Sequence, residues 1–424
     1  MIRRVFVDGY KSLQKVELAL APLTVIIGPN AAGKSNLFDA LRLLSSIVRS
    51  RSLAEAFNDH RGDPLEAFDY SEGGIPGLLA KQEARFTIEV DVQLSSATVN
   101  GAEELIQQHR RQGDEKNKPR RVTESLLRYR VTVAITPATG VLRIADEYLA
   151  ALKEEAGELR PDERRSPFLE RVGNRLRLRM EGQARPTEYE LGLTYAIASQ
   201  PVYPPHYPHL IAFREEVAHW QFYYFEPRLM REENPLKELY RLTSQGADLA
   251  AFYYTLKRTK PKQFENIQKS LTMVVPTVQG IDVELTEEGR LKLKTREHNV
   301  DYSSKVISEG TLRLLGLMAI LSPVNPATVV GFEEPENGVH PRRLKLIAEL
   351  LRNASEKKQI IVNTHSALLP EFFQDAYIVQ CTKQQGRSVF EPLPMKGLFL
   401  RPAVEAALDD VPLVSQRILR GDYE

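Results

Sequence analysis

The order of apolar and polar positions divides the chain into alternating strands and helices. Short apolar runs, rich in β-branched residues, occupy 23–28, 328–332 and 359–363, and such runs are typical of buried strands. Directly after the first run, residues 36–47 place apolar side chains at helical spacing. The pattern predicts an α/β fold in which strands from both ends of the chain share one core.

The middle of the chain has a different pattern. Residues 128–149 and 170–180 alternate around Thr-Gly and Gly-Asn turns, and residues 281–295 alternate in the same way, so we expect three antiparallel hairpins. No heptad repeat persists, which argues against a coiled coil. Residues 213–225 and 238–259 are interpreted as helices. The proline-rich stretch 201–209 is interpreted as a polyproline-like crossing loop.

The first apolar run leads into the sequence GPNAAGKS at residues 28–35. This is the P-loop pattern, in which backbone N–H groups cradle phosphates, Lys34 neutralises them and Ser35 ligates Mg²⁺. The helix that follows directs its N-terminal partial positive charge at the same anion. The residues expected to contact the nucleotide are Asn30, Ala31, Ala32, Gly33, Lys34, Ser35 and Asn36.

Two carboxylates, Glu333 and Glu334, follow the strand predicted at 328–332. Ligands of parallel sheets sit at the carboxyl ends of strands, where the P-loop also begins. We therefore expect Glu333 to hold Mg²⁺, directly or through water, and Glu334 to orient the attacking water. Paired acids after a strand also occur as solvated helix caps, but the distance from the P-loop and the following Pro335 favour the functional interpretation.

Two further segments carry candidate chemistry. His365 ends the last buried strand, where its imidazole can donate to a γ-phosphate; a purely structural histidine is the alternative. With Glu334 and Lys34 it completes the predicted catalytic set. Ser308 is placed to cap the helix that follows it, and Gly310 leaves that N-terminus open to bind the γ-phosphate held by another subunit.

Together with residues 2–13, 245–257 and 333–341, these segments resemble ABC-type ATPases of the SMC and RecF-like group, especially compact bacterial AAA-type ATPases near the overcoming-lysogenization-defect family. The resemblance implies a P-loop NTPase of the ABC-ATPase head type, with a mixed sheet, an antiparallel β-rich lobe and a helical insertion. It implies ATP and Mg²⁺ as cofactors and places Lys11 and Ser12 near the nucleotide. It also implies a homodimer that sandwiches two nucleotides, with Ser308 and Gly310 reaching ATP across the interface.

A P-loop near the start and its partner strands near the end require one split domain. The expected divisions are 1–95 for the N-terminal part of the ATPase core, 96–190 for the β-rich lobe with a basic loop, 191–300 for a mainly helical insertion ending in a hairpin, and 301–424 for the C-terminal part of the core and a terminal segment. Too few residues follow His365 for the nuclease domain of the resembled family, so we do not expect nuclease activity. Gln82 is a candidate for the glutamine that couples nucleotide state to the insertion.

Composition narrows the cellular setting. The single cysteine, Cys381, excludes an intrachain disulfide framework and fits a reducing cytosol, so we expect a cytoplasmic protein without a membrane span. The net charge of +1 offers no global argument for nucleic acid, although the basic stretch 109–121 is a local alternative. His206 and His209 lack an accompanying ligand cluster in sequence, which does not favour a metal site.

Our sequence-based hypothesis is an ATP-driven dimeric switch. The resemblance of the chain to these ATPases favours the sensor component of a bacterial anti-phage or mobile-element defence system, which controls a separate effector protein. Assembly beyond the dimer is left open. The first alternative is a DNA-repair or DNA-end-processing ATPase that clamps DNA when ATP is bound. The second is a scaffold that binds ATP and scarcely hydrolyses it.

Overall fold

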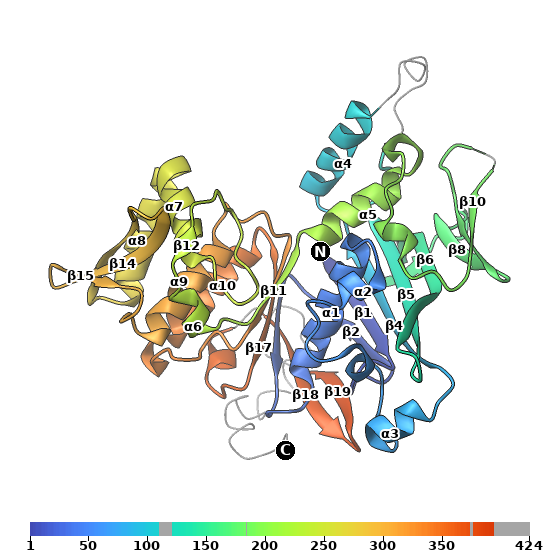
Figure 1. The fold of residues 1–424 in the computed structure, drawn as a ribbon, viewed down its shortest axis with the longest axis horizontal. Coiled ribbons are helices and arrows are strands. Elements are labelled where there is room, and N and C mark those ends of the chain that lie inside the picture. The colour runs from blue at the N-terminus through green and yellow to red at the C-terminus, as the bar shows by residue number, and fades with distance from the viewer. Residues whose placement is uncertain (110–120, 184, 374–375, 394–424) are drawn as a thin grey trace. The chain divides into compact units, whose positions relative to one another are not determined.

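The computed structural model describes residues 1–109, 121–183, 185–373 and 376–393, which form two compact units (Figure 1). Both units combine segments that are distant in the chain. Unit 1 consists of Met1–Ala21, Asn30–Trp220 and Cys381–Glu391, and unit 2 consists of Pro22–Pro29, Gln221–Gln380 and the described residues from Pro392.

Unit 1 contains a nine-stranded antiparallel sheet. Its order is β10-β9-β8-β6-β5-β4-β1-β2, and β7 pairs with β6 beside this path. Buried and half-buried residues alternate along β5, as expected for a strand with one face on the core. The predicted hairpins β5–β6 and β8–β9 are confirmed. The strands are β1 (Ile2–Asp8), β2 (Val16–Ala19), β4 (Ala84–Gln93), β5 (Leu126–Thr136), β6 (Val141–Glu155), β7 (Glu158–Pro161), β8 (Leu169–Val172), β9 (Arg175–Leu178) and β10 (Thr187–Glu190).

The helix α1, which follows the P-loop, is the longest described helix of unit 1. Most of α1 is buried, because it contacts α2, α5 and β4 (Figure 1). The described helices are α1 (Lys34–Arg49), α2 (Leu53–Ala56), α3 (Gly74–Leu79), α4 (Ser96–Gln108) and α5 (Pro208–Ala218), with 3₁₀ turns at Pro64–Ala67, Ile197–Ser199 and Pro204–His206.

Unit 2 contains the parallel part of the fold. Strands β16, β17, β3 and β18 lie side by side and parallel within the order β11-β16-β17-β3-β18-β19. Every residue of β3 and β17 is buried, as expected for strands covered on both faces. The bounds are β3 (Leu23–Ile27), β11 (Trp220–Tyr223), β16 (Val329–Glu333), β17 (Gln359–Thr364), β18 (Tyr377–Gln384) and β19 (Arg387–Pro392). Of this sheet, Cys381–Glu391 in β18 and β19 is counted with unit 1.

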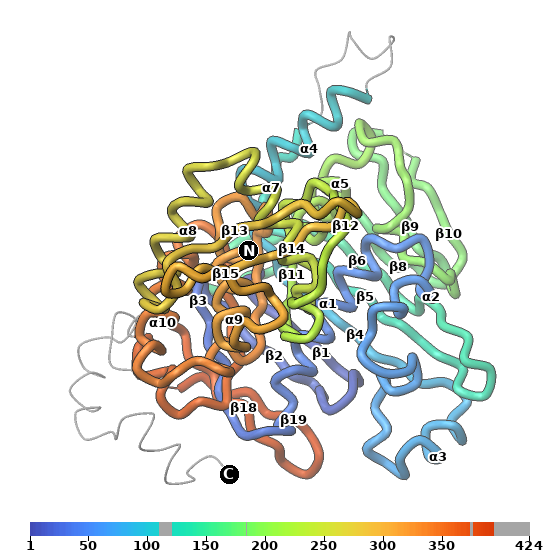
Figure 2. The backbone as a smooth tube through the Cα atoms, turned by 60° about the vertical axis from the view of Figure 1, so that its left-hand side comes forward, coloured from blue at the N-terminus to red at the C-terminus, as the bar shows by residue number. Residues whose placement is uncertain are grey.

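Helices α6 to α10 and strands β13 and β14 share one hydrophobic core with β3, β16 and β17. Figure 2 shows the small antiparallel sheet of β12 to β15 beside α7 and α8, which contact β14 and β13. The predicted hairpin β13–β14 is confirmed. These elements are α6 (Pro227–Met230), β12 (Asn234–Pro235), α7 (Leu249–Thr259), α8 (Pro261–Val274), β13 (Val278–Leu285), β14 (Arg290–Glu297), β15 (Val300–Ser303), α9 (Glu309–Leu321), a 3₁₀ turn at Pro341–Arg343, α10 (Leu344–Ser355) and a 3₁₀ turn at Leu369–Phe372.

Three sequence-based interpretations of the middle segment need correction: the two predicted helices are confirmed only over 213–218 and 249–259, and the crossing loop was wrong. Residues 220–223 form a strand, because Phe222 packs directly over Gly331 in β16, where a Cβ would lie 2.3 Å from its ring. The helix predicted over 238–259 begins only at Leu249, since Gly246 adopts a left-handed φ of 78° in a turn. The polyproline loop is instead a 3₁₀ turn followed by α5, whose first residue is a proline.

Candidate nucleotide-binding and hydrolysis site

The P-loop, residues 28–35, connects β3 to α1 through a backbone of repeated positive φ angles. Gly28, Ala31 and Gly33 have φ values of 155°, 63° and 108°. Such conformations turn successive N–H groups into an anion-binding concavity, and α1 begins at Lys34 immediately beyond it. The predicted strand, turn and helix are therefore present, and the loop fits the phosphate groups of a nucleotide.

Lys11, Ser12 and Asn36 lie together in unit 1, close to the P-loop. The amide nitrogen of Asn36 donates to the Ser12 hydroxyl at 2.7 Å, and Lys11 Nζ lies 2.8 Å from the carboxylate of Asp39 in α1. The three residues line a hollow of about 500 Å³. The hollow is also lined by Arg61 and Lys383 and by the acids Glu66 and Asp69, so its lining carries charges of both signs.

In unit 2, the ends of three parallel strands form one edge of the sheet. Glu333 is the last residue of β16 and pairs with Asn363, while Thr364 at the end of β17 pairs with Ile27 of β3. The P-loop leaves β3 at Gly28, at this same edge. Glu333, Glu334 and His365 therefore lie at the edge where a ligand of a parallel sheet is expected.

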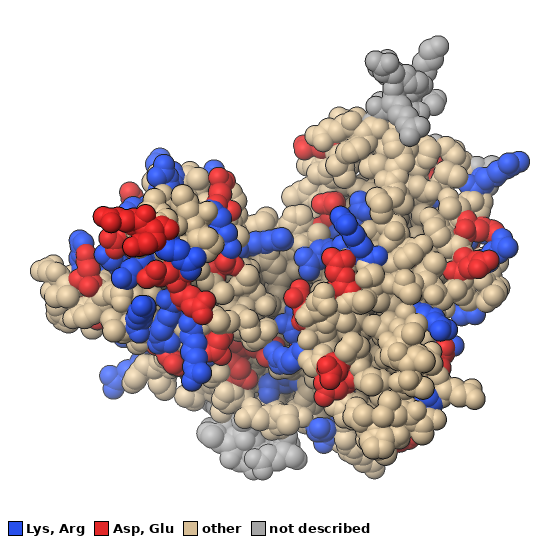
Figure 3. Space-filling view, in the orientation of Figure 1, with Lys and Arg blue, Asp and Glu red and all other residues tan. Residues whose placement is uncertain are grey.

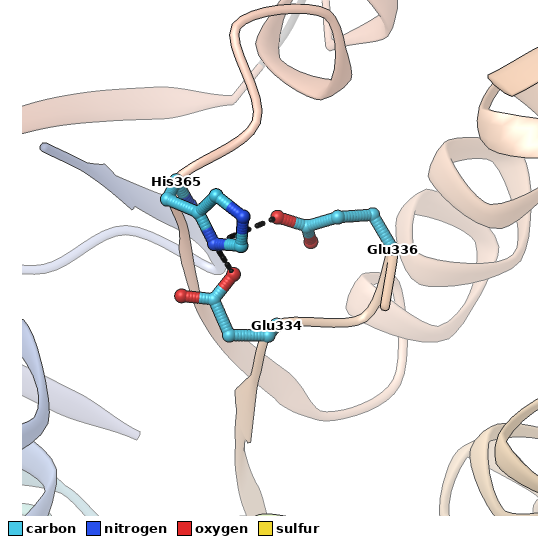
Figure 4. Close-up of side chains that lie close together, drawn as sticks. All are labelled: Glu334, Glu336 and His365. Carbon is cyan, nitrogen blue, oxygen red and sulfur yellow. Dashed lines mark hydrogen bonds and ion pairs between the residues drawn. The ribbon is translucent and has the colours of Figure 1, made fainter. Parts of the chain in front are cut away.

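Three side chains converge at this edge, namely Glu334, Glu336 and His365 (Figure 4). One ligand atom from each lies within 4.8 Å of the others. His365 Nδ1 contacts the Glu334 carboxylate and lies 3.9 Å from Glu336 Oε1. Glu334 itself has a φ of 52°, an uncommon conformation for a non-glycine residue, and its N–H donates to the carbonyl of Asn363 at 3.0 Å.

Glu336 is a site residue that the sequence analysis missed. Its Oε1 accepts hydrogen bonds from the Thr364 hydroxyl and from the Ser366 N–H at 3.2 Å, so it holds both neighbours of His365. Its Oε2 is buried without a partner among the described residues. Burial, and then the nearby Glu334 charge, raises the pKa of Glu336 to about 7. A third acid at spacing two in the run EEPE was the available sequence signal.

The proposed magnesium ligands fit the metal by their chemistry, because Ser35 and Glu333 supply the oxygen donors that Mg²⁺ prefers. Ser35 belongs to unit 1 and Glu333 to unit 2. Their joint coordination stays a prediction.

The N-terminus of α9 is capped as predicted. The Ser308 hydroxyl accepts from the Thr311 N–H at 3.2 Å, which satisfies one of the first unpaired donors of the helix. Gly310 is packed so closely that a Cβ there would lie 2.0 Å from the carbonyl oxygen of Gly338. A side chain at position 310 would therefore displace the loop that follows Glu336.

Other candidates have local structural roles or fall outside the described part. His209 Nδ1 contacts the Glu181 carboxylate, while its Nε2 accepts from the N–H of residues 123 and 124. Both ring nitrogens are thus used within unit 1. Gln82 is exposed just before β4. Of the basic stretch 109–121, residues 110–120 lie outside the described residues, as does the terminal segment from residue 394.

Comparison with known proteins identifies the family. The family described as "AAA domain, putative AbiEii toxin, Type IV TA system" matches residues 23–130 and 200–369, which is more than half of the chain. The chain belongs to this family. The two segments of the AAA-domain match include the P-loop, Ser308, the three clustered side chains and Glu333, whereas Lys11 and Ser12 precede them. No curated protein sequence matches the chain.

Solved structures of SMC head domains share the fold. An SMC head bound to the C-terminal winged-helix domain of ScpA has a TM-score of 0.55 at 14% identity, with 92% of this chain and 98% of that chain covered. A Pyrococcus furiosus SMC head with an extended coiled coil, bound to the C-terminal domain of ScpA, has a TM-score of 0.54 at 12% identity. The match covers 92% of this chain and 96% of that chain. A Pyrococcus yayanosii SMC head with a coiled coil and joint has a TM-score of 0.51 at 11% identity, and the match covers 99% of each chain.

At these identities, the structural likeness establishes the fold alone. The family match confirms the predicted AAA-type ATPase family, and the fold is the predicted one of SMC-type head domains. In the described part of the chain, no helix has the length and apolar character needed to span a membrane.

Proposed function

We propose that this chain binds MgATP and hydrolyses it, and that the ATP-bound form is a homodimer which acts as a switch. The observation that carries the proposal is the convergence of Glu334, Glu336 and His365 at the sheet edge from which β3 enters the P-loop. An acid pair beside an imidazole, with one of the two carboxylates largely buried, has little value for stability, since desolvation opposes it, and such groups concentrate at functional sites.

Glu334 is the proposed water-orienting residue. Its contact with His365 Nδ1 holds the carboxylate at the strand end, where it can accept a proton from a water molecule aligned with the γ-phosphate. Lys34 and the P-loop N–H groups would neutralise the phosphate oxygens. ATP supplies the phosphoryl group, and Mg²⁺ held by Ser35 and Glu333 would offset its charge.

His365 is the proposed sensor of the γ-phosphate. Its side chain is 45% exposed, so a ligand can reach it. With Nδ1 directed at a carboxylate, the ring donates to a phosphate from Nε2 only in its doubly protonated form. Loss of the γ-phosphate would then release His365 and the loop that Glu336 holds.

Dimerisation in the proposal depends on the N-terminus of α9. Ser308 and Gly310 stand at a capped helix start that can bind the γ-phosphate held by a second copy of the chain. The exposed Val306, two residues before Ser308, adds apolar surface beside this helix end. Two chains would then sandwich two nucleotides.

For the biological role, we propose the cytoplasmic sensor of a bacterial anti-phage or mobile-element defence system that controls a separate effector protein. Support comes from the family, whose description names a toxin–antitoxin system. Two of the structurally similar SMC heads are bound to a partner protein, ScpA.

The alternative function, a DNA-clamping ATPase, requires clustered basic side chains. Figure 3 shows lysine and arginine interspersed with acids on the face of unit 2 that it displays. On the small sheet of that unit, Lys294 pairs with Glu284 and Arg296 with Asp301. Paired charges of this kind do not favour DNA over the effector hypothesis.

Phosphate release from MgATP is the direct test. We expect wild-type protein to release phosphate, Lys34→Ala to lose ATP binding, and Glu334→Gln to bind ATP with turnover reduced about 100-fold or more, since general-base groups contribute roughly 10²–10⁴-fold. Glu356→Gln, an exposed acid at the end of α10, is the matched control and should behave as wild type.

Unchanged turnover in Glu334→Gln would remove that residue from the mechanism. ATP binding without phosphate release by the wild type would favour the scaffold hypothesis. Salt-sensitive retention of duplex DNA that requires ATP would favour the DNA-clamping hypothesis.

A further inference from the structure

The hairpin of β18 and β19 contacts the P-loop inside unit 1. The carbonyl oxygen of Ala32 accepts a hydrogen bond from the Ser388 hydroxyl at 2.6 Å and one from the Cys381 thiol at 3.5 Å. Ser388 and Ala32 are 356 positions apart in the chain. Ser388, with 2% of its surface exposed, is therefore buried against the loop expected to hold the phosphates.

The hydrogen bonds around Ser388 have a defined direction. A carbonyl oxygen only accepts, so the single hydroxyl proton of Ser388 goes to Ala32. Ser12 lies 2.6 Å from Ser388 and must then donate its own proton to that oxygen. Ser12 in turn can only accept from Asn36, whose amide nitrogen lies 2.7 Å away. Donation therefore runs from α1 through the β1–β2 connection to the hairpin and ends on the P-loop.

Gly33 packs closely against the hydroxyl groups of Ser12 and Ser388. A Cβ at Gly33 would lie 1.9 Å from the Ser388 hydroxyl and 2.9 Å from that of Ser12. The Ser388 N–H also donates to the Ser12 carbonyl at 2.9 Å. Both the backbone and the side chain of Ser388 are thus held in place against the loop.

Fixing the Ala32 carbonyl has a consequence for the next amide group. The peptide unit is planar and trans, so the N–H of Gly33 points opposite to the Ala32 carbonyl oxygen. We infer that Ser388 is a positioning residue of the nucleotide site, which holds the Ala32–Gly33 peptide so that its N–H faces the phosphates. The C-terminal hairpin is then part of the ATP-binding device. This inference rests on the proposed function of the P-loop.

Cys381 supports the same carbonyl oxygen from the adjacent strand. Burial raises the pKa of its thiol to about 12, so the sulfur keeps its proton and acts as a donor. The family match ends at residue 369, and both Cys381 and Ser388 lie beyond it. The hairpin contact is thus a property of this chain that the matched family segments do not include.

Nucleotide affinity tests the inference. In Ser388→Ala the peptide loses its main anchor while Lys34 and the loop sequence remain, so we expect the Kd and KM for ATP to rise about 5- to 20-fold and kcat at saturating ATP to stay within about twofold. Thr382→Ala, on the same hairpin but without a described contact to the P-loop, is the matched control and should keep wild-type affinity.

Ser12→Ala provides a second variant in case Ser388→Ala is poorly folded. It removes the donor to Ser388 and the acceptor of Asn36 but keeps the hydrogen bond from Ser388 to Ala32, and we expect a smaller rise in Kd. Wild-type Kd in a folded Ser388→Ala protein would overturn the inference, and so would an equal loss in Thr382→Ala. If Lys34→Ala also bound ATP normally, the proposed function itself would fail; normal binding in Ser388→Ala alone would leave that function standing.

Discussion

Glu336 combines a buried carboxylate, an unpaired oxygen and two hydrogen bonds to the segment that carries His365. Only 9% of its side chain is exposed, and burial without full pairing costs free energy. In return, Glu336 accepts hydrogen bonds from Thr364 and Ser366, which hold the backbone on both sides of His365, the proposed sensor. Supporting residues of this kind orient the groups that act on the ligand.

If Glu336 acts through its accepting Oε1, a neutral acceptor should replace it. We expect Glu336→Ala to lower kcat about 10- to 100-fold, the range typical for lost supporting contacts, and Glu336→Gln to stay within about threefold of wild type. The KM for ATP should change little in both. A glutamine variant as impaired as the alanine variant would show that the charge, and not the accepting oxygen, is what matters.

Glu147 in β6 predicts a pH dependence of folding. It is fully buried, and although the N–H groups of Ile197 and Ala198 donate to it, burial raises its pKa from 4.5 to about 7. The folded state therefore binds this proton more tightly than the unfolded state. The resulting stabilisation, on the order of 3 kcal/mol, is present below pH 4.5 and lost as the pH rises through 7.

Urea unfolding at pH 4.5 to 8 measures this effect. Wild type should lose free energy of unfolding across the interval more steeply than Glu147→Gln, which has no proton to release at this position. The variant can differ in absolute stability, because an amide nitrogen would replace one accepting oxygen. Parallel pH profiles for the two proteins would contradict the assignment.

At the scale of elements, the start of α9 is positioned by contact with the loop after Glu336. Gly310→Ala would place a methyl group 2.0 Å from the Gly338 carbonyl oxygen, and backbone cannot move aside as a flexible side chain can. We expect kcat to fall at least 10-fold, measured by phosphate release, together with a lower Tm.

Gly101→Ala in α4 is the contrasting control for that change. Nothing lies within 4 Å of a Cβ at this position, and alanine is the better helix former. We expect it to stabilise the protein by up to about 1 kcal/mol without altering turnover. A harmless Gly310→Ala would argue against a fixed contact between α9 and this loop.

The sequence pattern correctly predicted those elements whose structure depends on neighbouring residues in the chain. The strand, P-loop and helix over 23–47 and the three hairpins were predicted because period, turn residues and motif occur together in the sequence. The aromatic run after Trp220 was assigned to a helix, since its packing over Gly331 depends on a strand more than a hundred residues away. Tertiary contacts override propensity in such segments.

The candidate site was predictable to the same extent. Glu334 and His365 were found because each ends an apolar run, and the structure places their side chains in contact. Ser388 carries no motif, and its role depends on a contact between distant segments that only the fold creates. Glu336 was visible as an acid but was indistinguishable from a solvated one without knowledge of its burial.

At the scale of the whole molecule, the two units divide the proposed chemistry. Lys34, Ser35, Cys381 and Ser388 belong to unit 1, whereas Glu333, Glu334, His365 and Ser308 belong to unit 2. ATP-dependent assembly of two copies of the chain is the central claim of the account.

The mass of purified Glu334→Gln protein in solution, with and without MgATP, tests this claim most directly. ATP should stay bound because the phosphate contacts survive, so we expect a monomer without nucleotide and a dimer with it. Lys34→Ala should remove the dimer by loss of ATP, and Ser308→Arg should remove it by obstructing the helix end that faces the partner's nucleotide.

The same sample can be mixed separately with a candidate effector protein and with duplex DNA. Recruitment of the effector by the ATP-bound dimer, with no retention of DNA, is the result that we predict. A Glu334→Gln protein that binds ATP and remains monomeric, or a Ser308→Arg variant that still dimerises on ATP, would contradict the account.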